Sequence, residues 1–239
     1  MDSVKPAGAV TKPRGVFFDW DGTLVDTLPW LLKAHNHVRV TLGHEPWSNE
    51  EYKNIIRYSS RELYGRLYGE KEAEAHSILH SYIEEHHLQN LNILPGAEAL
   101  LKMLNEAGVT VGLVSNKKHS FLCREVAHLG WEAYFSAIIG AGQATRDKPA
   151  GDPVLMAIAQ SGIAGDADVE AGSFAQGGMR HDIWYVGDSE TDMLAAQDSG
   201  CAAVLVHHHH DNRDLLGRYH PHLAFDDCHD FIGQFTKIR

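Results

Sequence analysis

The sequence has few cysteines and no long apolar run. Its three cysteines, Cys123, Cys201 and Cys228, are odd in number and lie far apart, so they form neither a CxxC metal pair nor a disulfide framework, and we expect a reducing, cytoplasmic location. No segment approaches the roughly 20 apolar residues that a membrane helix needs. Residues 1–15 are polar and lack the hydrophobic segment of a secretory signal. We therefore expect no membrane partner.

Positive charge is also scarce. The 239 residues carry a formal net charge of −11 and no basic block, which argues against nucleic acid as the main partner. Hydrophobic residues make up 44% of the chain, enough for a sizeable core. If an acidic protein of this kind binds a phosphate ester, its site needs a metal ion and a few well-placed lysines. The sequence does not indicate an oligomeric state.

Short apolar segments alternate with helical ones along most of the chain, a pattern typical of a parallel sheet with helices on both faces. The strand-like segments are Gly15–Asp19, Val109–Val114, Ala137–Gly140, Ile183–Val186 and Ala202–Val206. Apolar residues at three- and four-residue intervals fill the stretch after the first strand. We predict a doubly wound, Rossmann-like α/β core of residues 1–28 and 94–239 and a helical cap domain of residues 29–93.

Two segments are predicted to be loops. Gly165–Arg180 is rich in glycine and has no periodicity, which indicates a surface loop. His207–His210 directly follows the last predicted strand. We interpret this histidine run as a solvated loop at the edge of the site, with metal binding by neighbouring imidazoles as the alternative.

Polar groups that suit a phosphate or a cation follow the predicted strands, where ligands of such sheets bind. Two aspartates one residue apart precede a Gly-Thr turn whose backbone N–H groups could hold an anion. A hydroxyl, an amide and a lysine follow the second strand, a further lysine precedes a helix, and two aspartates lie one helical turn apart. The first motif is the strongest and the other three are weak alone, but all four in order are a strong signal. They are Asp19-Trp20-Asp21-Gly22-Thr23, Ser115-Asn116-Lys117, Lys148-Pro149 and Asp188 with Asp192.

In these motifs the chain resembles the haloacid dehalogenase-like hydrolase superfamily, close to its phosphoglycolate phosphatase branch. Phe18–Asp26 resembles the first family motif, with Trp20 where leucine is commoner, and Val114–Lys117, Lys148–Pro153 and Gly187–Asp192 resemble the others. The resemblance covers about residues 15–206. The spacing between the third and fourth motifs departs from the family, because Gly165–Arg180 lengthens it.

The resemblance implies a Mg²⁺-dependent phosphatase acting on a small phosphorylated metabolite. Asp19 would be the nucleophile that forms an aspartyl-phosphate, and Asp21 the general acid and base. Asp19 and Asp188 would bind Mg²⁺ together with the backbone carbonyl of Asp21, and Asp192 would support the metal directly or through water. The phosphoryl oxygens would be held by Gly22, Thr23, Ser115, Asn116 and Lys148.

Alternatives remain for both substrate and reaction. Phosphoglycolate is the best single substrate prediction, with sugar phosphates and nucleoside monophosphates as rivals. Asp21 favours a phosphatase or phosphomutase, since the family's dehalogenases and phosphonate-cleaving members lack it. A β-phosphoglucomutase-like enzyme would pass the phosphoryl group to a sugar, and a non-catalytic binding module would retain only the fold.

Overall fold

The computed structural model describes residues 11–55, 60–163, 180–208 and 212–238, and these residues fall into two compact units. One unit contains the chain up to Val25 and from Ile93 onward, and the other is Asp26–Asn92. Two short strands, β2 (Val25–Asp26) and β3 (Asn92–Ile93), pair where the chain passes from one unit to the other. Each unit is described below by itself.

The first unit is built on a six-stranded sheet whose neighbouring strands all run parallel. In spatial order the strands are β5 (Ala137–Ala141), β4 (Thr110–Lys118), β1 (Gly15–Phe18), β6 (Arg180–Gly187), β7 (Cys201–Val206) and β8 (Leu223–Phe225). The order reverses direction at β1, which lies between β4 and β6. Open sheets of this kind bind ligands beyond the carboxyl ends of the strands at such a reversal.

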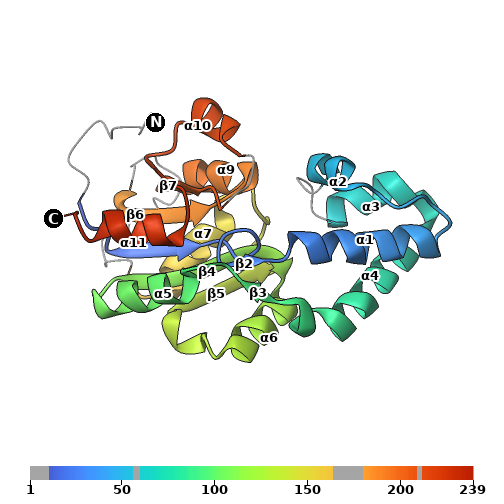
Figure 1. Cartoon of the computed structure of the whole chain (residues 1–239), viewed down its shortest axis with the longest axis horizontal. Helices are drawn as coiled ribbons and strands as arrows, with labels where there is room; N and C mark the ends of the chain where they lie inside the picture. The colour runs from blue at the N-terminus through green and yellow to red at the C-terminus, as the bar shows by residue number, and fades with distance from the viewer. Residues whose placement is uncertain (1–10, 56–59, 164–179, 209–211, 239) are drawn as a thin grey trace. The chain divides into compact units, whose positions relative to one another are not determined.

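Helices cover the sheet so that its central strands are buried on both faces. The helices of this unit are α5 (Ala97–Glu106), α6 (His119–Leu129), α7 (Asp152–Gln160), α9 (Glu190–Ser199), α10 (Asp214–Tyr219) and α11 (Cys228–Phe235). The helices α7 and α9 pack on each other and against the strands, while α5 and α11 lie side by side (Figure 1). The side chains of β6 show that both faces of the sheet are buried.

Alternate side chains of β6 enter different parts of the core. Ile183 and Tyr185 belong to the apolar cluster that includes residues of α7 and α9. Trp184, between them in sequence, packs its ring against Phe231 and Phe235 of α11. Because both faces are buried, the strand needs apolar residues at consecutive positions rather than at every second one.

The structure confirms the predicted fold class, a doubly wound parallel α/β sheet. The five predicted strands correspond to β1, β4, β5, β6 and β7, although β4 and β6 are longer than predicted. The sixth strand, β8, was not predicted, because a three-residue strand is too short to show a period. The helices α10 and α11 were not predicted either. Of the predicted glycine-rich loop, residues 165–179 lie outside the described residues.

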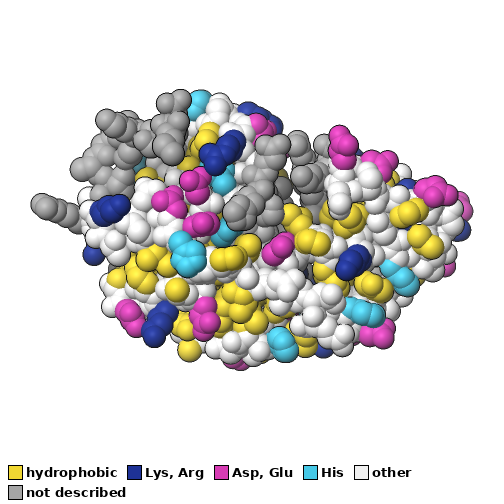
Figure 2. All heavy atoms as spheres, viewed as in Figure 1, with side chains coloured by type: hydrophobic (Ala, Val, Ile, Leu, Met, Phe, Trp, Pro, Cys, Tyr) yellow, Lys and Arg dark blue, Asp and Glu magenta, His cyan; other side chains and the backbone are white. Residues whose placement is uncertain are grey.

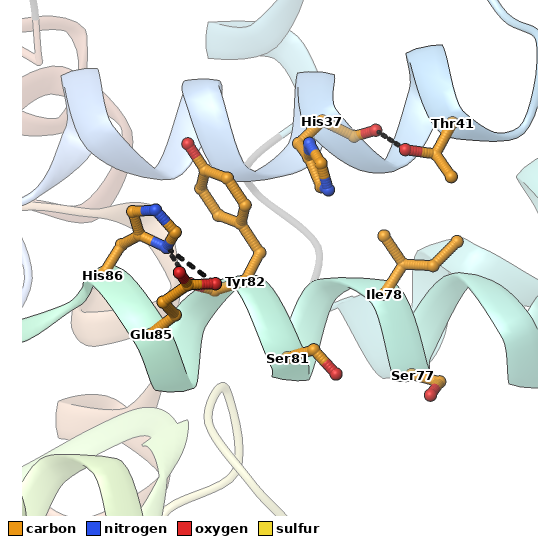
Figure 3. Close-up of a pocket in the computed structure, with 8 residues that line it drawn as sticks. All are labelled: His37, Thr41, Ser77, Ile78, Ser81, Tyr82, Glu85 and His86. Carbon is orange, nitrogen blue, oxygen red and sulfur yellow. Dashed lines mark hydrogen bonds and ion pairs between the residues drawn. The ribbon is translucent and has the colours of Figure 1, made fainter.

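The second unit is helical. Its helices are α1 (Leu28–Thr41), α2 (Asn49–Ile55), α3 (Ser60–Tyr68) and α4 (Glu72–His86). The core of this unit is formed by Trp30, Ala34, Val38, Tyr64, Ala75 and Leu79, together with Tyr68. An open groove between α1 and α4 is lined by aromatic and polar side chains, and Tyr82 lies between His37 and His86 in it (Figure 3).

The described surface shows no block of one charge on the face drawn in Figure 2, where acidic, basic and histidine side chains are interspersed with apolar ones. Among the described helices, none combines the length and the apolar composition that crossing a membrane requires.

His35 makes the stability of the helical unit depend on pH. Its ring packs against Trp47, Tyr52 and Tyr64, and its Nδ1 lies 2.8 Å from the Tyr64 hydroxyl. Burial lowers the pKa of His35 from 6.5 to about 4. Between these two values the unfolded chain binds the proton more readily than the folded chain. Stability is therefore fully present above pH 6.5 and falls as the pH drops toward 4.

We expect the free energy of unfolding to fall by roughly 1–2 kcal/mol between pH 7 and pH 5 through His35. The His35→Asn variant, which places a polar group near Nδ1 but does not titrate, should lose less stability over that interval. His37→Asn on the exposed face of the same helix is the matched control. Urea unfolding of the three proteins at both pH values measures the effect, and equal pH dependence of all three would contradict it.

Candidate active site

The carboxyl ends of three adjacent strands bring the predicted site residues together. Asp19 directly follows β1, Asp188 directly follows β6, and Ser115 lies near the end of β4. Since β1 pairs with both β4 and β6, the three residues share one edge of the sheet. The predicted Ser115-Asn116-Lys117 motif lies inside β4 rather than after it, where the register with β5 shifts between Val114 and Lys118.

Lys148 joins two of the aspartates. Its Nζ donates hydrogen bonds to Asp19 Oδ1 at 2.6 Å and to Asp192 Oδ1 at 2.7 Å, and all three side chains are buried. Burial disfavours the ammonium, but the carboxylates of Asp19 and Asp192 outweigh it and raise the pKa of Lys148 well above its usual value. Lys148 therefore stays charged and fixes the carboxylate of Asp19.

The other oxygen of Asp192 binds the start of its own helix. Asp192 Oδ2 accepts from the Ser189 backbone N–H at 3.0 Å, which is one half of a capping box at the first turn of α9, and it also accepts from the Ser189 hydroxyl. Tyr185 donates its hydroxyl to the carbonyl of Val114 at 3.1 Å and lies 3.4 Å from Asp192 Oδ1. Both Asp192 oxygens are thus already bonded, which favours an indirect part in binding a cation.

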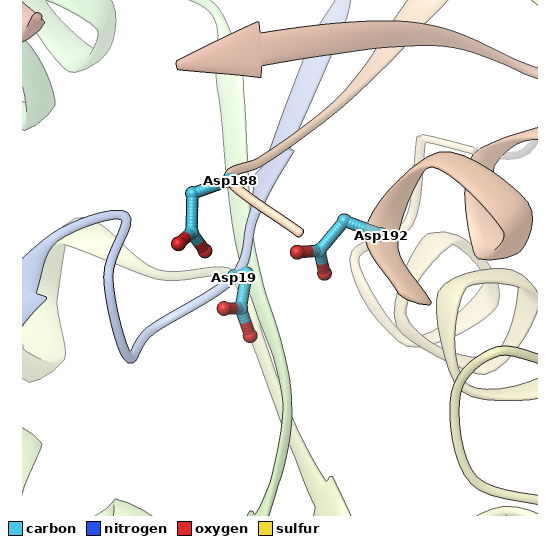
Figure 4. A group of neighbouring side chains, drawn as sticks. All are labelled: Asp19, Asp188 and Asp192. Carbon is cyan, nitrogen blue, oxygen red and sulfur yellow. The ribbon is translucent and has the colours of Figure 1, made fainter. Parts of the chain in front are cut away.

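Asp19, Asp188 and Asp192 each offer a carboxylate oxygen within 4.8 Å of the others, and Figure 4 shows these three neighbouring side chains. Burial, together with the neighbouring Asp192 and Asp21 carboxylates, raises the pKa of Asp19 to about 7 despite the opposing charge of Lys148. Burial and the carboxylates of Asp192 and Asp19 also raise the pKa of Asp188 well above its usual value. Keeping Asp19 and Asp188 ionised at this site therefore costs free energy.

A divalent cation fits this group of side chains. Among the described residues bonded or clustered at this edge, five carboxylates are accompanied by only two ammonium groups. The carboxylates belong to Asp19, Asp21, Asp188, Asp192 and Glu125, and the ammonium groups to Lys117 and Lys148. Hard cations such as Mg²⁺ prefer oxygen ligands and commonly use one or two carboxylates. Their positive charge would offset the repulsion that raises the pKa values of Asp19 and Asp188.

The backbone donors of the Gly-Thr turn bond within the turn. The Gly22 backbone N–H donates to the Val25 carbonyl at 2.8 Å, and the Thr23 N–H donates to the Trp20 carbonyl at 3.3 Å. These donors hold the turn itself, and phosphate binding by Gly22 and Thr23 stays a prediction. Gly22 has φ +87°, and a Cβ there would lie 2.5 Å from Asp188 Oδ2. Glycine is required because the turn passes against the Asp188 carboxylate.

Ser115 and Asn116 serve different neighbours. Ser115 is buried, and its Oγ accepts the Lys117 backbone N–H at 3.1 Å. The Asn116 amide accepts the Lys148 backbone N–H at 3.0 Å and donates to the Lys148 carbonyl at 2.9 Å. Because both ends of the Asn116 amide bind the backbone of Lys148, this side chain positions the lysine, and its contact with a phosphate stays a prediction.

A second buried network surrounds Asp21 and was not predicted. Lys117 Nζ lies 2.8 Å from Asp21 Oδ1 and 2.6 Å from Glu125 Oε2. Trp20 Nε1 donates to the same Glu125 oxygen at 2.7 Å, and Glu125 is only 1% exposed. Burial disfavours the charge of Lys117, but the Asp21 and Glu125 carboxylates raise its pKa. Trp20, from within the first motif, is thereby tied to α6.

Known proteins match nearly the whole chain. The family model described as "Haloacid dehalogenase-like hydrolase" matches residues 16–206, which include every residue of the carboxylate cluster. The chain is 29% identical to phosphoglycolate phosphatase 1 of Pseudomonas aeruginosa, over 97% of this chain and 83% of that protein. It is 28% identical to the phosphoglycolate phosphatase of Chromobacterium violaceum, over 85% of this chain and 89% of that protein.

A solved structure supports the fold. The haloacid dehalogenase-like family hydrolase of Streptococcus pneumoniae superposes with a TM-score of 0.75 at 19% identity, covering 92% of this chain and 97% of that chain.

We expect Glu125→Gln to lower the free energy of unfolding by about 1–3 kcal/mol. The amide keeps the shape of the side chain, but the buried ammonium of Lys117 is left with one carboxylate instead of two. Urea unfolding measures the change, with Glu132→Gln, at an exposed position just beyond the same helix, as the control. Equal unfolding midpoints for the two variants would show that the charge of Glu125 does not stabilise the fold.

Proposed function

The chain belongs to the haloacid dehalogenase-like hydrolase family and is a phosphatase of that family. We propose that it hydrolyses a small phosphate monoester through a Mg²⁺-assisted aspartyl-phosphate intermediate. The observation that carries this proposal is the cluster of the buried Asp19, Lys148 and Asp192 with the partly buried Asp188. When bound, Mg²⁺ would neutralise part of the negative charge on the phosphoryl group. Asp19, Asp188 and the backbone carbonyl of Asp21 would hold it, with Asp192 acting through Lys148.

In the first step a carboxylate oxygen of Asp19 attacks the phosphorus atom and the bond from phosphorus to the leaving oxygen breaks. Lys148 offsets the repulsion between this carboxylate and the anionic phosphoryl group, because it stays protonated beside Asp19. Ser115, within the neighbouring strand β4, is proposed to donate its hydroxyl to a phosphoryl oxygen.

Asp21 is proposed to move the protons. It donates a proton to the departing alkoxide, then takes a proton from the water that attacks the aspartyl-phosphate and releases inorganic phosphate. Lys117, 2.8 Å from Asp21 Oδ1, holds this carboxylate beside the site. The two aspartates of the first motif thus receive separate tasks, nucleophile and proton carrier.

Phosphoglycolate is the substrate that we propose, since the two relatives named above are phosphoglycolate phosphatases at 28–29% identity. The helical unit is proposed as the cap domain that the sequence predicts for residues 29–93. A cytosolic location is proposed as well, since Cys123, Cys201 and Cys228 are all free thiols.

We expect Asp19→Asn to lower phosphate release by at least about 1,000-fold, because the amide cannot attack phosphorus. Phosphoglycolate should still bind, which isothermal titration calorimetry would measure. The control Asp214→Asn, at an exposed position in α10, should keep normal turnover. Turnover retained by Asp19→Asn would remove Asp19 from the role of nucleophile.

Phosphate release should require Mg²⁺, stop on addition of EDTA and return when Mg²⁺ is restored, because the clustered carboxylates need a cation before an anionic substrate can approach them. Undiminished release in EDTA would contradict the metal requirement.

We expect phosphoglycolate to give the highest kcat/KM in a panel that includes sugar phosphates and nucleoside monophosphates. The assay contains no sugar bisphosphate, so a phosphomutase that depends on such an activator would release little phosphate.

A further inference from the structure

We infer that His208 and Asn212, in the segment that follows β7, are positioning residues that fix the two loops carrying the proposed metal ligands. This inference rests on the proposed function and adds residues that lie outside its motifs. One loop begins with Asp188, and the other is the turn from Asp19 to Thr23. Each loop receives a hydrogen bond from one of the two side chains.

Asn212 holds the backbone of Asp188. Its Nδ2 donates to the Asp188 carbonyl at 2.7 Å and to the Val206 carbonyl at 3.1 Å. Its Oδ1 lies 2.5 Å from His207 Nδ1, so that the ring N–H of His207 fixes the orientation of the amide. Asn212 and His207 are both buried. The loop after β6 is thus tied to the end of β7, the neighbouring strand.

His208 holds the other loop. Its Nε2 lies 2.9 Å from the Thr23 carbonyl, which can only accept, so this nitrogen carries the hydrogen. Thr23 follows Gly22, whose backbone passes against the Asp188 carboxylate, and the Thr23 hydroxyl lies 3.4 Å from Asp188 Oδ1. A shift of the Thr23 carbonyl would therefore change the distance between the two loops.

The backbone of His208 supports a role for its ring. His208 has φ +44°, in the left-handed region that disfavours side chains with a Cβ, and only 3% of the residue is exposed. Strained residues of this kind persist where surrounding contacts hold them, and they cluster at functional sites. His220 has nearly the same backbone, φ +46°, but is exposed at the end of α10. It provides a matched control for the strain.

These contacts correct the prediction that the histidine run is a solvated loop. His207 and His208 are buried, with their rings bonded to Asn212 and to the Thr23 carbonyl. His209 and His210 lie outside the described residues. The described part of the run is therefore a support for the site rather than its solvent-exposed edge.

The experiment compares His208→Leu with His208→Gln. Glutamine places an N–H donor near the position of Nε2, whereas leucine has similar bulk and no donor. Titration calorimetry with Mn²⁺, without substrate, measures metal affinity apart from turnover. We expect leucine to weaken Mn²⁺ binding about 10- to 100-fold and glutamine to stay within about threefold of wild type. Asn212→Leu should also weaken binding about 10- to 100-fold. His220→Leu should leave it unchanged.

Unfolding midpoints separate positioning from packing. If His208→Leu lowers the midpoint but binds Mn²⁺ as wild type does, the inference is overturned, and equal losses of affinity with leucine and glutamine would overturn it too. Should His208→Leu not fold, His208→Asn replaces it, since asparagine is too short to reach the Thr23 carbonyl and is expected to lose affinity. Wild-type protein that neither binds Mn²⁺ nor releases phosphate would instead contradict the proposed function.

Discussion

The rest of the site depends on one constraint, the gathering of several buried carboxylates at the carboxyl edge of one sheet. Like charges in a poorly solvated place repel, and the pKa of Asp19, raised to about 7, reflects that cost. Lys148 and Lys117 reduce it, and each does so by bonding two carboxylates. The remaining excess of negative charge explains why the site suits a divalent cation and why a substrate anion would need one.

This constraint requires the whole sheet. The bonded groups come from the ends of β1, β4 and β6, from the loop before α7, and from the helices α6 and α9. Parallel strands bring these ends together only when helices bury both faces, as α9 and α11 do around Tyr185 and Trp184. The apolar core therefore supplies the energy that holds the carboxylates in proximity, and the hydrogen bonds among the polar groups set their directions.

The sequence predicts the fold class and the carboxylate cluster because both leave local signals. A buried strand that ends on Asp19 or Asp188 shows as a short apolar segment followed by an acid. Glu125 leaves no such signal, since a single glutamate in a helix is usually solvated. The burial of His208 and Asn212 depends on contacts with distant residues. From the sequence, the N–H groups of Gly22 and Thr23 were available to an anion. In the structure both donate to carbonyls of their own turn, which the sequence pattern does not reveal.

The two aspartates of the first motif are kept apart by parallel sets of partners. Lys148 bonds Asp19 and a helical carboxylate, Asp192 of α9. Lys117 bonds Asp21 and a helical carboxylate, Glu125 of α6. Trp20, between the aspartates in sequence, binds Glu125 through its ring N–H and so ties the motif to α6. Each aspartate thus has its own lysine and its own helix, so two neighbouring acids are held in different surroundings. The proposed division into nucleophile and proton carrier rests on this separation, because each carboxylate is then positioned independently of the other.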